Sequence, residues 1–247
     1  MKYKNIKEIC REIDLIIEKK DNKTDYKYLY SDMLNVLKGK IDYSEIVIFC
    51  NTVLLIAKTK NRILRYLEKD FWDFINKMPF QLLLIQRIEI SKNEVIESNT
   101  DYDNQGKKIL SRLIGLSKEI LELPDDNSKG SELRRSCSLK LIADLINYYE
   151  VTDARNLFIN SIKSRNKGEQ YNALLGLENY YEFTDDDIDD ELIKTLNEII
   201  KNTDDRTVAS TCLQIQINAG IIDEMIAVSV MDDWKDDHFY YHKEKKY

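Results

Sequence analysis

A heptapeptide recurs in the second half of this chain. Residues Asn147–Asp153 are Asn-Tyr-Tyr-Glu-Val-Thr-Asp, and residues Asn179–Asp185 are Asn-Tyr-Tyr-Glu-Phe-Thr-Asp, 32 positions later. A weaker echo, Asn218–Asp223, follows 39 positions after that. Each copy ends an apolar run with helical periodicity. A recurrence of roughly 30–45 residues built from helices predicts an α-solenoid, in which neighbouring units bury one continuous core.

The composition also favours a helical chain. The 247 residues include 7 glycines and 2 prolines, whereas average usage would supply roughly 17 and about 12. A genome rich in lysine, isoleucine and asparagine would give the same bias without regard to fold. Because the periodicity agrees with the composition, we expect an all-α fold of about eleven to thirteen helices, arranged as a right-handed α-solenoid of helix pairs.

The apolar periodicity places these helices along the chain. It predicts helices over residues 2–20, 25–38, 46–58, 63–76, 80–90, 109–123, 130–150, 154–165, 167–183, 188–202, 205–219 and 221–232. Met78 and Pro79 are expected to stop one helix, and Asp42 and Glu45 predict a capping box for another. We pair the last six helices in sequence order, so that 167–183 pairs with 188–202.

Two polar interruptions suggest how the chain is organised. They lie at residues 99–104 and 124–128. We expect an N-terminal helical lobe over residues 1–123, a repeat lobe over 124–232 and a charged, aromatic C-terminal tail over 233–247. One continuous solenoid accommodates all three, because stacked repeats need not divide into independent domains.

The charge of the chain is unevenly distributed. The net charge is −7, but Glu178–Asp205 contains eleven acids against Lys194 and Lys201, so the remaining residues carry about +2. Binding to a phosphate backbone needs a basic footprint, which makes nucleic acid an unfavoured partner. A local acidic surface suits a basic protein partner. The alternatives are a solvated surface and, for Asp185–Glu191, acids that stabilise the start of a helix.

We expect partner contacts at an acidic run and at aromatic side chains near it. The tyrosines have an alternative role in packing between repeats, and the tryptophan one in a terminal helix that caps the last repeat. The predicted contact residues are Tyr180, Tyr181, Asp185, Asp186, Asp187, Asp189, Asp190 and Trp234.

Candidates for catalysis and metal binding are few. The sequence lacks the glycine-rich motifs that bind phosphates and the serine elbow of hydrolases. His238 and His242 would share a helical face and could hold a metal with Asp233 or Asp237, but the glutamate of a zinc-protease box is missing. A solvated or partner-contacting tail is the preferred interpretation. We therefore expect no cofactor, no metal and no enzymatic activity.

The remaining features favour a cytoplasmic protein. The N-terminus shows no signal peptide, and no apolar run approaches the ~18 residues that span a bilayer. The four cysteines are widely spaced, without the spacing of a metal site, and are interpreted as reduced and mostly buried.

Two stretches resemble the second helix of a HEAT-like repeat. They are Leu133–Leu141 and Asp204–Cys212, and the family pattern is an acidic turn followed by Val-Arg-x-x-Ala. Cys137 and Cys212 stand where the family has alanine, and Ala209 replaces the arginine. The resemblance covers residues 130–232, and the middle unit lacks the Val-Arg start. It implies the fold of stacked helix pairs and no particular activity.

These features together favour a non-catalytic binding protein with a basic protein partner. The size, the acidity and the lack of catalytic motifs are similar to those of immunity proteins of bacterial toxin systems, some of which are helical-repeat proteins that mask a basic nuclease toxin. The resemblance implies a toxin as the partner. One alternative is an enzyme that acts on nucleic acid, similar to helical-repeat DNA glycosylases, and another is a structural scaffold.

Overall fold

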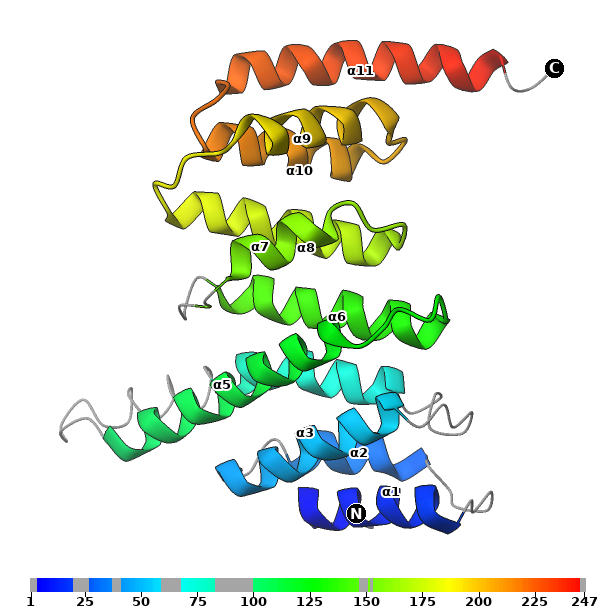
Figure 1. Ribbon diagram of the computed structural model, residues 1–247, viewed down its shortest axis with the longest axis vertical. Helices are drawn as coiled ribbons and strands as arrows, with labels where there is room; N and C mark the ends of the chain where they lie inside the picture. Colours follow the sequence, from blue (N-terminus) through cyan, green and yellow to red (C-terminus); the bar gives the residue numbers. More distant parts are fainter. Residues whose placement is uncertain are drawn as a thin grey trace. The chain divides into compact units, whose positions relative to one another are not determined.

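The computed structural model is entirely helical in its regular elements (Figure 1). It describes residues 4–19, 27–36, 41–58, 68–82, 100–146, 151 and 153–244, with side chains for all of these except residues 16, 19, 27–30, 100–104 and 235–244. No strand occurs within those ranges. The all-α expectation is therefore confirmed.

The chain divides into two compact units, residues Met1–Leu141 and Ile142–Tyr247. The first unit contains helices α1 (Ile6–Lys19), α2 (Lys27–Val36), α3 (Tyr43–Lys58), residues 68–82, α5 (Thr100–Glu122) and most of α6 (Lys129–Leu145). Helix α1 packs against α2 and α3, and α3 packs against α5. Phe49 lies at the centre of this core, with its ring centroid 6.1 Å from that of Phe71 and 4.9 Å from that of Phe74.

The predicted break at Met78 and Pro79 is wrong, because residues 68–82 form one helix. Proline removes one backbone hydrogen bond of a helix. Here Ile75, Met78 and Leu82 nevertheless continue one buried face across it. Burial of that face outweighs the lost bond. The rest of the predicted helices 63–76 and 80–90 lies outside the described residues.

Helix α5 begins at Thr100, whereas the sequence pattern predicts a polar interruption there and a helix start at residue 109. The first turn contains Thr100, Asp101 and Asp103. Acids and short polar residues are favoured at a helix N-terminus, where they offset the unpaired N–H groups. The polar run is therefore the start of the helix. The capping box of α3 is confirmed, since the Glu45 N–H donates to Asp42 Oδ1 over 3.0 Å and the Asp42 N–H donates to Glu45 Oε2 over 3.3 Å.

The second unit contains the repeated segment. Its helices are α7 (Ala154–Ser161), α8 (Lys167–Phe183), α9 (Asp190–Asn202), α10 (Arg206–Asn218) and α11 (Glu224–Glu244). Helix α7 packs against α8, α9 packs against α10, and α10 also packs against α8 and α11 (Figure 1). The main partner of α9 is thus α10, although the sequence pairs it with α8. The backbone of α11 continues to Glu244, through most of the segment that we expect to be a tail.

Side-chain caps fix where these helices begin. Asn166 accepts from the N–H groups of Gly168 and Glu169, and Asp205 accepts from those of Thr207 and Val208. Asp189 and Asp223 cap α9 and α11 in the same way, each through an N–H three residues later. Gly220, with a φ of 70°, ends α10 in the left-handed conformation that glycine adopts without a steric penalty.

The asparagines of the repeat link α8 and α10 each to the helix two places earlier in the chain. Asn179 Nδ2 donates to the Ala143 carbonyl over 2.9 Å, and Asn218 Nδ2 donates to the Glu178 carbonyl over 3.1 Å. Each bond spans about one repeat, with sequence separations of 36 and 40 residues. Asn147, in the first copy, lies outside the described residues. The recurrence in the sequence thus corresponds to a recurring hydrogen bond.

Candidate functional site

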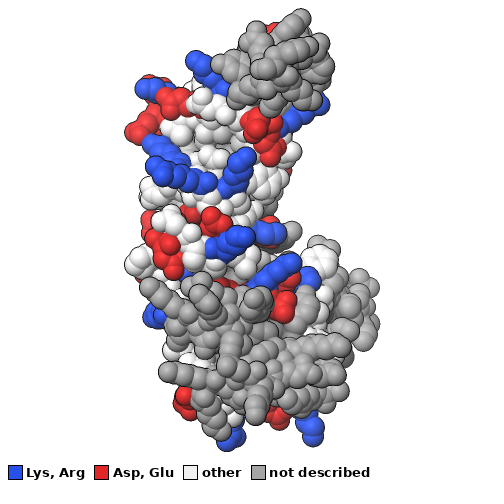
Figure 2. Space-filling view, turned by 90° about the vertical axis from the view of Figure 1, so that its right-hand side faces the viewer, with Lys and Arg blue, Asp and Glu red and all other residues white. Residues whose placement is uncertain are grey.

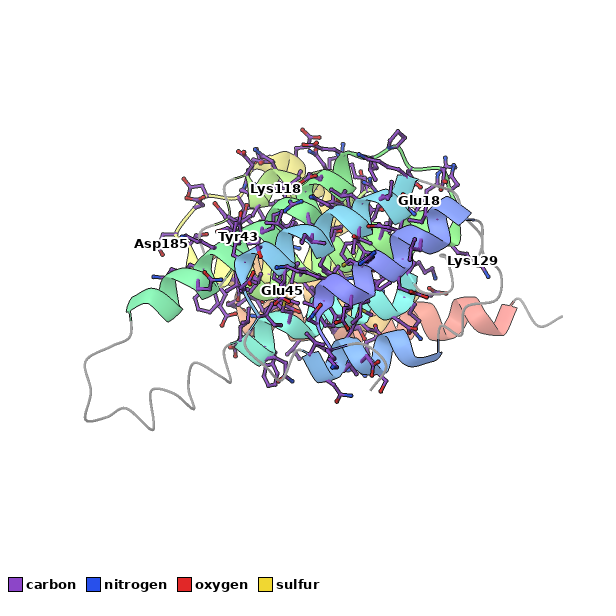
Figure 3. The ribbon with its side chains drawn as sticks, turned by 90° about the horizontal axis from the view of Figure 1, so that it is seen from below. Glu18, Tyr43, Glu45, Lys118, Lys129 and Asp185 are labelled. Carbon is purple, nitrogen blue, oxygen red and sulfur yellow. The ribbon has the colours of Figure 1, made fainter. Side chains whose placement is uncertain are left out.

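The loop between α8 and α9 carries most of the predicted contact residues. Residues 184–189 connect the two helices at one end of the second unit (Figure 1), and Figure 3 labels Asp185 on this loop. Thr184 Oγ1 donates to the Tyr180 carbonyl over 2.8 Å, and Asp189 Oδ1 accepts the Leu192 N–H over 2.8 Å. Ile188 is buried between these two ends. The loop is therefore fixed to the helices on both sides.

Arg155 of α7 ties this loop to the packed helices. Its Nε donates to the Tyr181 hydroxyl over 2.8 Å, and its Nη2 lies 3.0 Å from Asp189 Oδ2. The Leu192 N–H and then the Arg155 guanidinium lower the pKa of Asp189 below its ordinary value. Burial raises the pKa of the Tyr181 hydroxyl. Asp189 therefore both caps α9 and forms an ion pair with α7.

The two predicted tyrosines have structural contacts in the second unit. Tyr181 is only 2% exposed, and its ring packs edge-on against that of Tyr180 with centroids 5.3 Å apart. The Tyr180 hydroxyl donates to Asp186, and this bond raises the pKa of Tyr180. Trp234 is half-buried, and its Nε1 donates to the Ile200 carbonyl over 3.1 Å. These contacts favour the packing role for Tyr181 and account for the position of Asp186.

The other predicted acids are exposed, and they follow an exposed aromatic side chain that the sequence pattern does not single out. Asp185, Asp187 and Asp190 are exposed, and Phe183 at the end of α8 is 60% exposed. The equivalent position of the first repeat, Val151, is 9% exposed. We call Phe183, Asp185, Asp187 and Asp190 the acidic corner. The substitution of phenylalanine for valine between two copies was the available signal, but only the structure shows that this ring is exposed.

Basic residues gather at the turn between α7 and α8 and at the beginning of α10. The turn between α7 and α8 carries Lys163, Arg165 and Lys167, and α10 begins with Arg206. Lys163 Nζ lies 3.3 Å from Glu191 Oε1. Figure 2 shows the face that includes this end, where basic and acidic side chains alternate on the described surface. The charged residues of the acidic corner are all acids, but Arg155 and Lys163 pair with Asp189 and Glu191 on either side of Asp190.

The chemistry for catalysis or metal binding is sparse among the described residues. They contain no group of three or more His, Cys, Asp or Glu side chains that could hold a metal ion. The side chains of His238 and His242 lie outside them. Burial raises the pKa of the thiols of Cys10, Cys50 and Cys212 to about 12, so these cysteines are poor nucleophiles.

None of the described helices combines the length and the apolar character that a membrane span needs.

No protein-family model matches the chain, and no curated protein matches its sequence. Among solved structures, the chain is similar to a crystal structure of an engineered protein from the Northeast Structural Genomics Consortium, with 9% sequence identity over 86% of this chain and 96% of that chain and a TM-score of 0.36. A likeness of this size supports no argument about fold or function.

Proposed function

We propose that this chain is a non-catalytic protein-binding module whose acidic corner holds a basic protein partner. One observation carries this proposal. Phe183, the last residue of α8, is 60% exposed, and the exposed Asp185, Asp187 and Asp190 follow it in a loop fixed at both ends and in the first turn of α9. Such an arrangement combines an apolar anchor with a charged rim.

The aromatic ring and the carboxylates of the acidic corner suit binding to a cationic protein surface. Aromatic side chains contribute much of the binding energy at interfaces, because they bury a large apolar area and lose little conformational entropy. Carboxylates around the ring would attract lysines and arginines of a partner and accelerate association. Since the bonds of Tyr180, Arg155 and Leu192 already hold the loop, little ordering would be needed on binding.

We infer that the second unit is built from HEAT-like repeats. The asparagine bonds of Asn179 and Asn218 support this inference, because each spans about one repeat, as does the contact between α8 and α10. Stacked repeats present their loops in rows, which is how such proteins form extended binding surfaces.

A narrower form of the proposal makes the chain a bacterial immunity protein and the partner a basic toxin. Its support is the expected match between a cationic nuclease and the exposed acids of the acidic corner. Tight masking of a toxin would require a larger interface than the corner alone, with the corner at its centre.

Affinity capture from the source organism, followed by mass spectrometry, tests the proposal. The bait proteins are the wild-type chain, the double variant Asp185→Lys/Asp187→Lys, and Phe183→Ala. A matched control, Glu198→Lys/Asp204→Lys, makes the same change in net charge at exposed positions of α9 and the loop that follows it. We expect one dominant basic protein with the wild type and the control, lost in high salt and lost with both corner variants.

Two results would contradict the proposal. One is equal recovery of the same protein by the wild type and both corner variants, which would place its binding surface elsewhere. The other is recovery of nucleic acid alone, which would favour the enzyme alternative.

A further inference from the structure

A groove in the second unit carries opposite charges on its two sides. It has a volume of about 360 Å³ and lies at the end of the unit where the α7–α8 turn and the α9–α10 loop are found (Figure 1). Lys163 and Lys167 line one side, and Glu198 and Asp204 line the other. The remaining lining residues are Ile162, Gln170, Thr195, Ile199, Asn202 and Thr203.

The charges on the two sides do not neutralise each other directly. Lys167, Glu198 and Asp204 are exposed, and none of them forms an ion pair with another described residue. Lys163 does form a pair, because its Nζ lies 3.3 Å from Oε1 of Glu191, a residue that does not line the groove. The charges without an ion-pair partner are therefore one cation, on the α8 side, and two carboxylates, on the α9 side.

The two amide side chains of the groove are oriented by bonds to the backbone. Gln170 Nε2 donates to the Ile162 carbonyl, and Asn202 Nδ2 donates to the Glu198 carbonyl, each over 2.8 Å. Each amide thus uses a donor on the fold and leaves its oxygen, an acceptor, for other contacts. Acceptor oxygens beside two carboxylates suit the ammonium group of a ligand, whereas the Lys167 ammonium group suits an anionic group.

The groove also offers a small aliphatic surface. Ile199 is half-buried, and Ile162 beside it in the lining is fully buried. The volume of about 360 Å³ is near the lower end of the range of roughly 300–1,000 Å³ that small-molecule sites occupy. A small ligand with a short hydrocarbon part therefore fits better than a large one.

We propose that this groove binds a small zwitterion of the class of a free α-amino acid with an aliphatic side chain. The Lys167 ammonium group donates to the carboxylate of the ligand, and Glu198 and Asp204 accept from its ammonium group. Ile199 contacts the hydrocarbon chain. A polyanion would meet Glu198 and Asp204 as like charges. The groove shares no residue with the acidic corner, so the two proposals succeed or fail separately.

Isothermal titration calorimetry of the full chain at low salt tests the proposal with L-leucine and two blocked forms. N-acetyl-L-leucine lacks the positive charge, and L-leucine amide lacks the negative charge. We expect L-leucine to bind with a Kd below about 1 mM, and each blocked form to bind at least about tenfold more weakly, because each engages one side of the groove only.

Two charge-removing variants assign each end of the ligand to a side of the groove. Lys167→Gln and Glu198→Gln/Asp204→Asn should each weaken L-leucine binding at least about tenfold. Lys167→Gln should also abolish the preference for L-leucine over L-leucine amide. Glu198→Gln/Asp204→Asn should abolish the preference for L-leucine over N-acetyl-L-leucine, since a lost interaction cannot be lost twice.

The controls are Lys194→Gln and Glu182→Gln, which each remove one charge from an exposed position of the same unit outside the lining of the groove. Both should bind L-leucine within about twofold of the wild type, because solvent screens charges at the surface. Far-UV circular dichroism should be the same for all variants, since the changed residues are exposed. The proposal is overturned if L-leucine does not bind at about 10 mM. It is also overturned if either blocked form binds as tightly, or if the two groove variants leave the affinity unchanged.

Discussion

Phe158 of α7 occupies the space that a side chain at Gly176 of α8 would need. A Cβ atom at residue 176 would lie 2.3 Å from two ring carbons of Phe158, and the Phe158 ring is fully buried. We expect Gly176→Ala to lower the free energy of unfolding by roughly 1–3 kcal/mol, because the core must shift to accept one methyl group. Urea denaturation measures the change.

Gly106 of α5 provides the control for this substitution. A Cβ atom there has no neighbour within 4 Å. Gly106→Ala should therefore raise the free energy of unfolding by roughly 0.5–1 kcal/mol through helix propensity alone. Equal urea midpoints for the two variants would show that α7 and α8 do not pack as described.

Asp189 makes a pH-dependent contribution to stability. Its pKa is lowered by the Leu192 N–H and by Arg155, so the carboxylate stabilises the fold above its unfolded-state pKa. That contribution disappears as the pH falls through the lower folded-state pKa. Asp189→Asn keeps an oxygen that can cap α9 but removes the charge. We expect the variant to be less stable than the wild type at pH 7, and the difference to shrink below about pH 4.

Thermal unfolding between pH 3 and pH 7 measures this difference. Asp204→Asn is the control, because Asp204 is exposed and does not cap a helix. A constant difference between wild type and Asp189→Asn across this range would show that the ion pair with Arg155 does not contribute.

At the scale of whole helices, the sequence repeat is explained by the bonds of Asn179 and Asn218 to carbonyls one repeat earlier. Removing either amide deletes a part-buried side-chain hydrogen bond between two helices. We expect Asn179→Ala and Asn218→Ala each to cost about 1–2 kcal/mol of unfolding free energy. Asn202→Ala serves as the control, because Asn202 is exposed and donates within its own helix to Glu198. Costs for all three variants within about 0.5 kcal/mol of zero would contradict this role of the repeat.

The existence of the helices could be predicted, but their ends less well. The bounds of α8 agree with the predicted residues 167–183, because Asn166 is a strong cap and the apolar period is regular. The predicted stop at Pro79 fails, since local propensity says nothing of the packing of Met78 and Leu82. The partner of α9 could not be predicted either, because helix pairing depends on contacts that are distant in sequence.

At the scale of the whole molecule, the sequence shows where the acidic residues are concentrated but not which of them have a structural role. Glu178–Asp205 carries eleven acids against two lysines. The structure assigns Asp189 and Asp205 to helix caps and Asp186 to Tyr180, and it leaves Asp185 and Asp187 exposed beside Phe183. A count of acids does not show which of them accept structural hydrogen bonds, because that depends on which carboxylate oxygen lies near which donor in the fold. That the Phe183 ring is exposed also depends on how the helices pack.

We propose that the acidic corner recognises a basic protein. The most direct test is the association rate of the captured partner with the wild-type chain and with Asp185→Lys/Asp187→Lys, measured by stopped-flow at several salt concentrations. For the wild type we predict a rate that falls steeply with salt. For the variant we predict a rate at least about tenfold lower at low salt, with a shallower dependence. Identical rates and identical salt slopes for the two proteins would contradict the account.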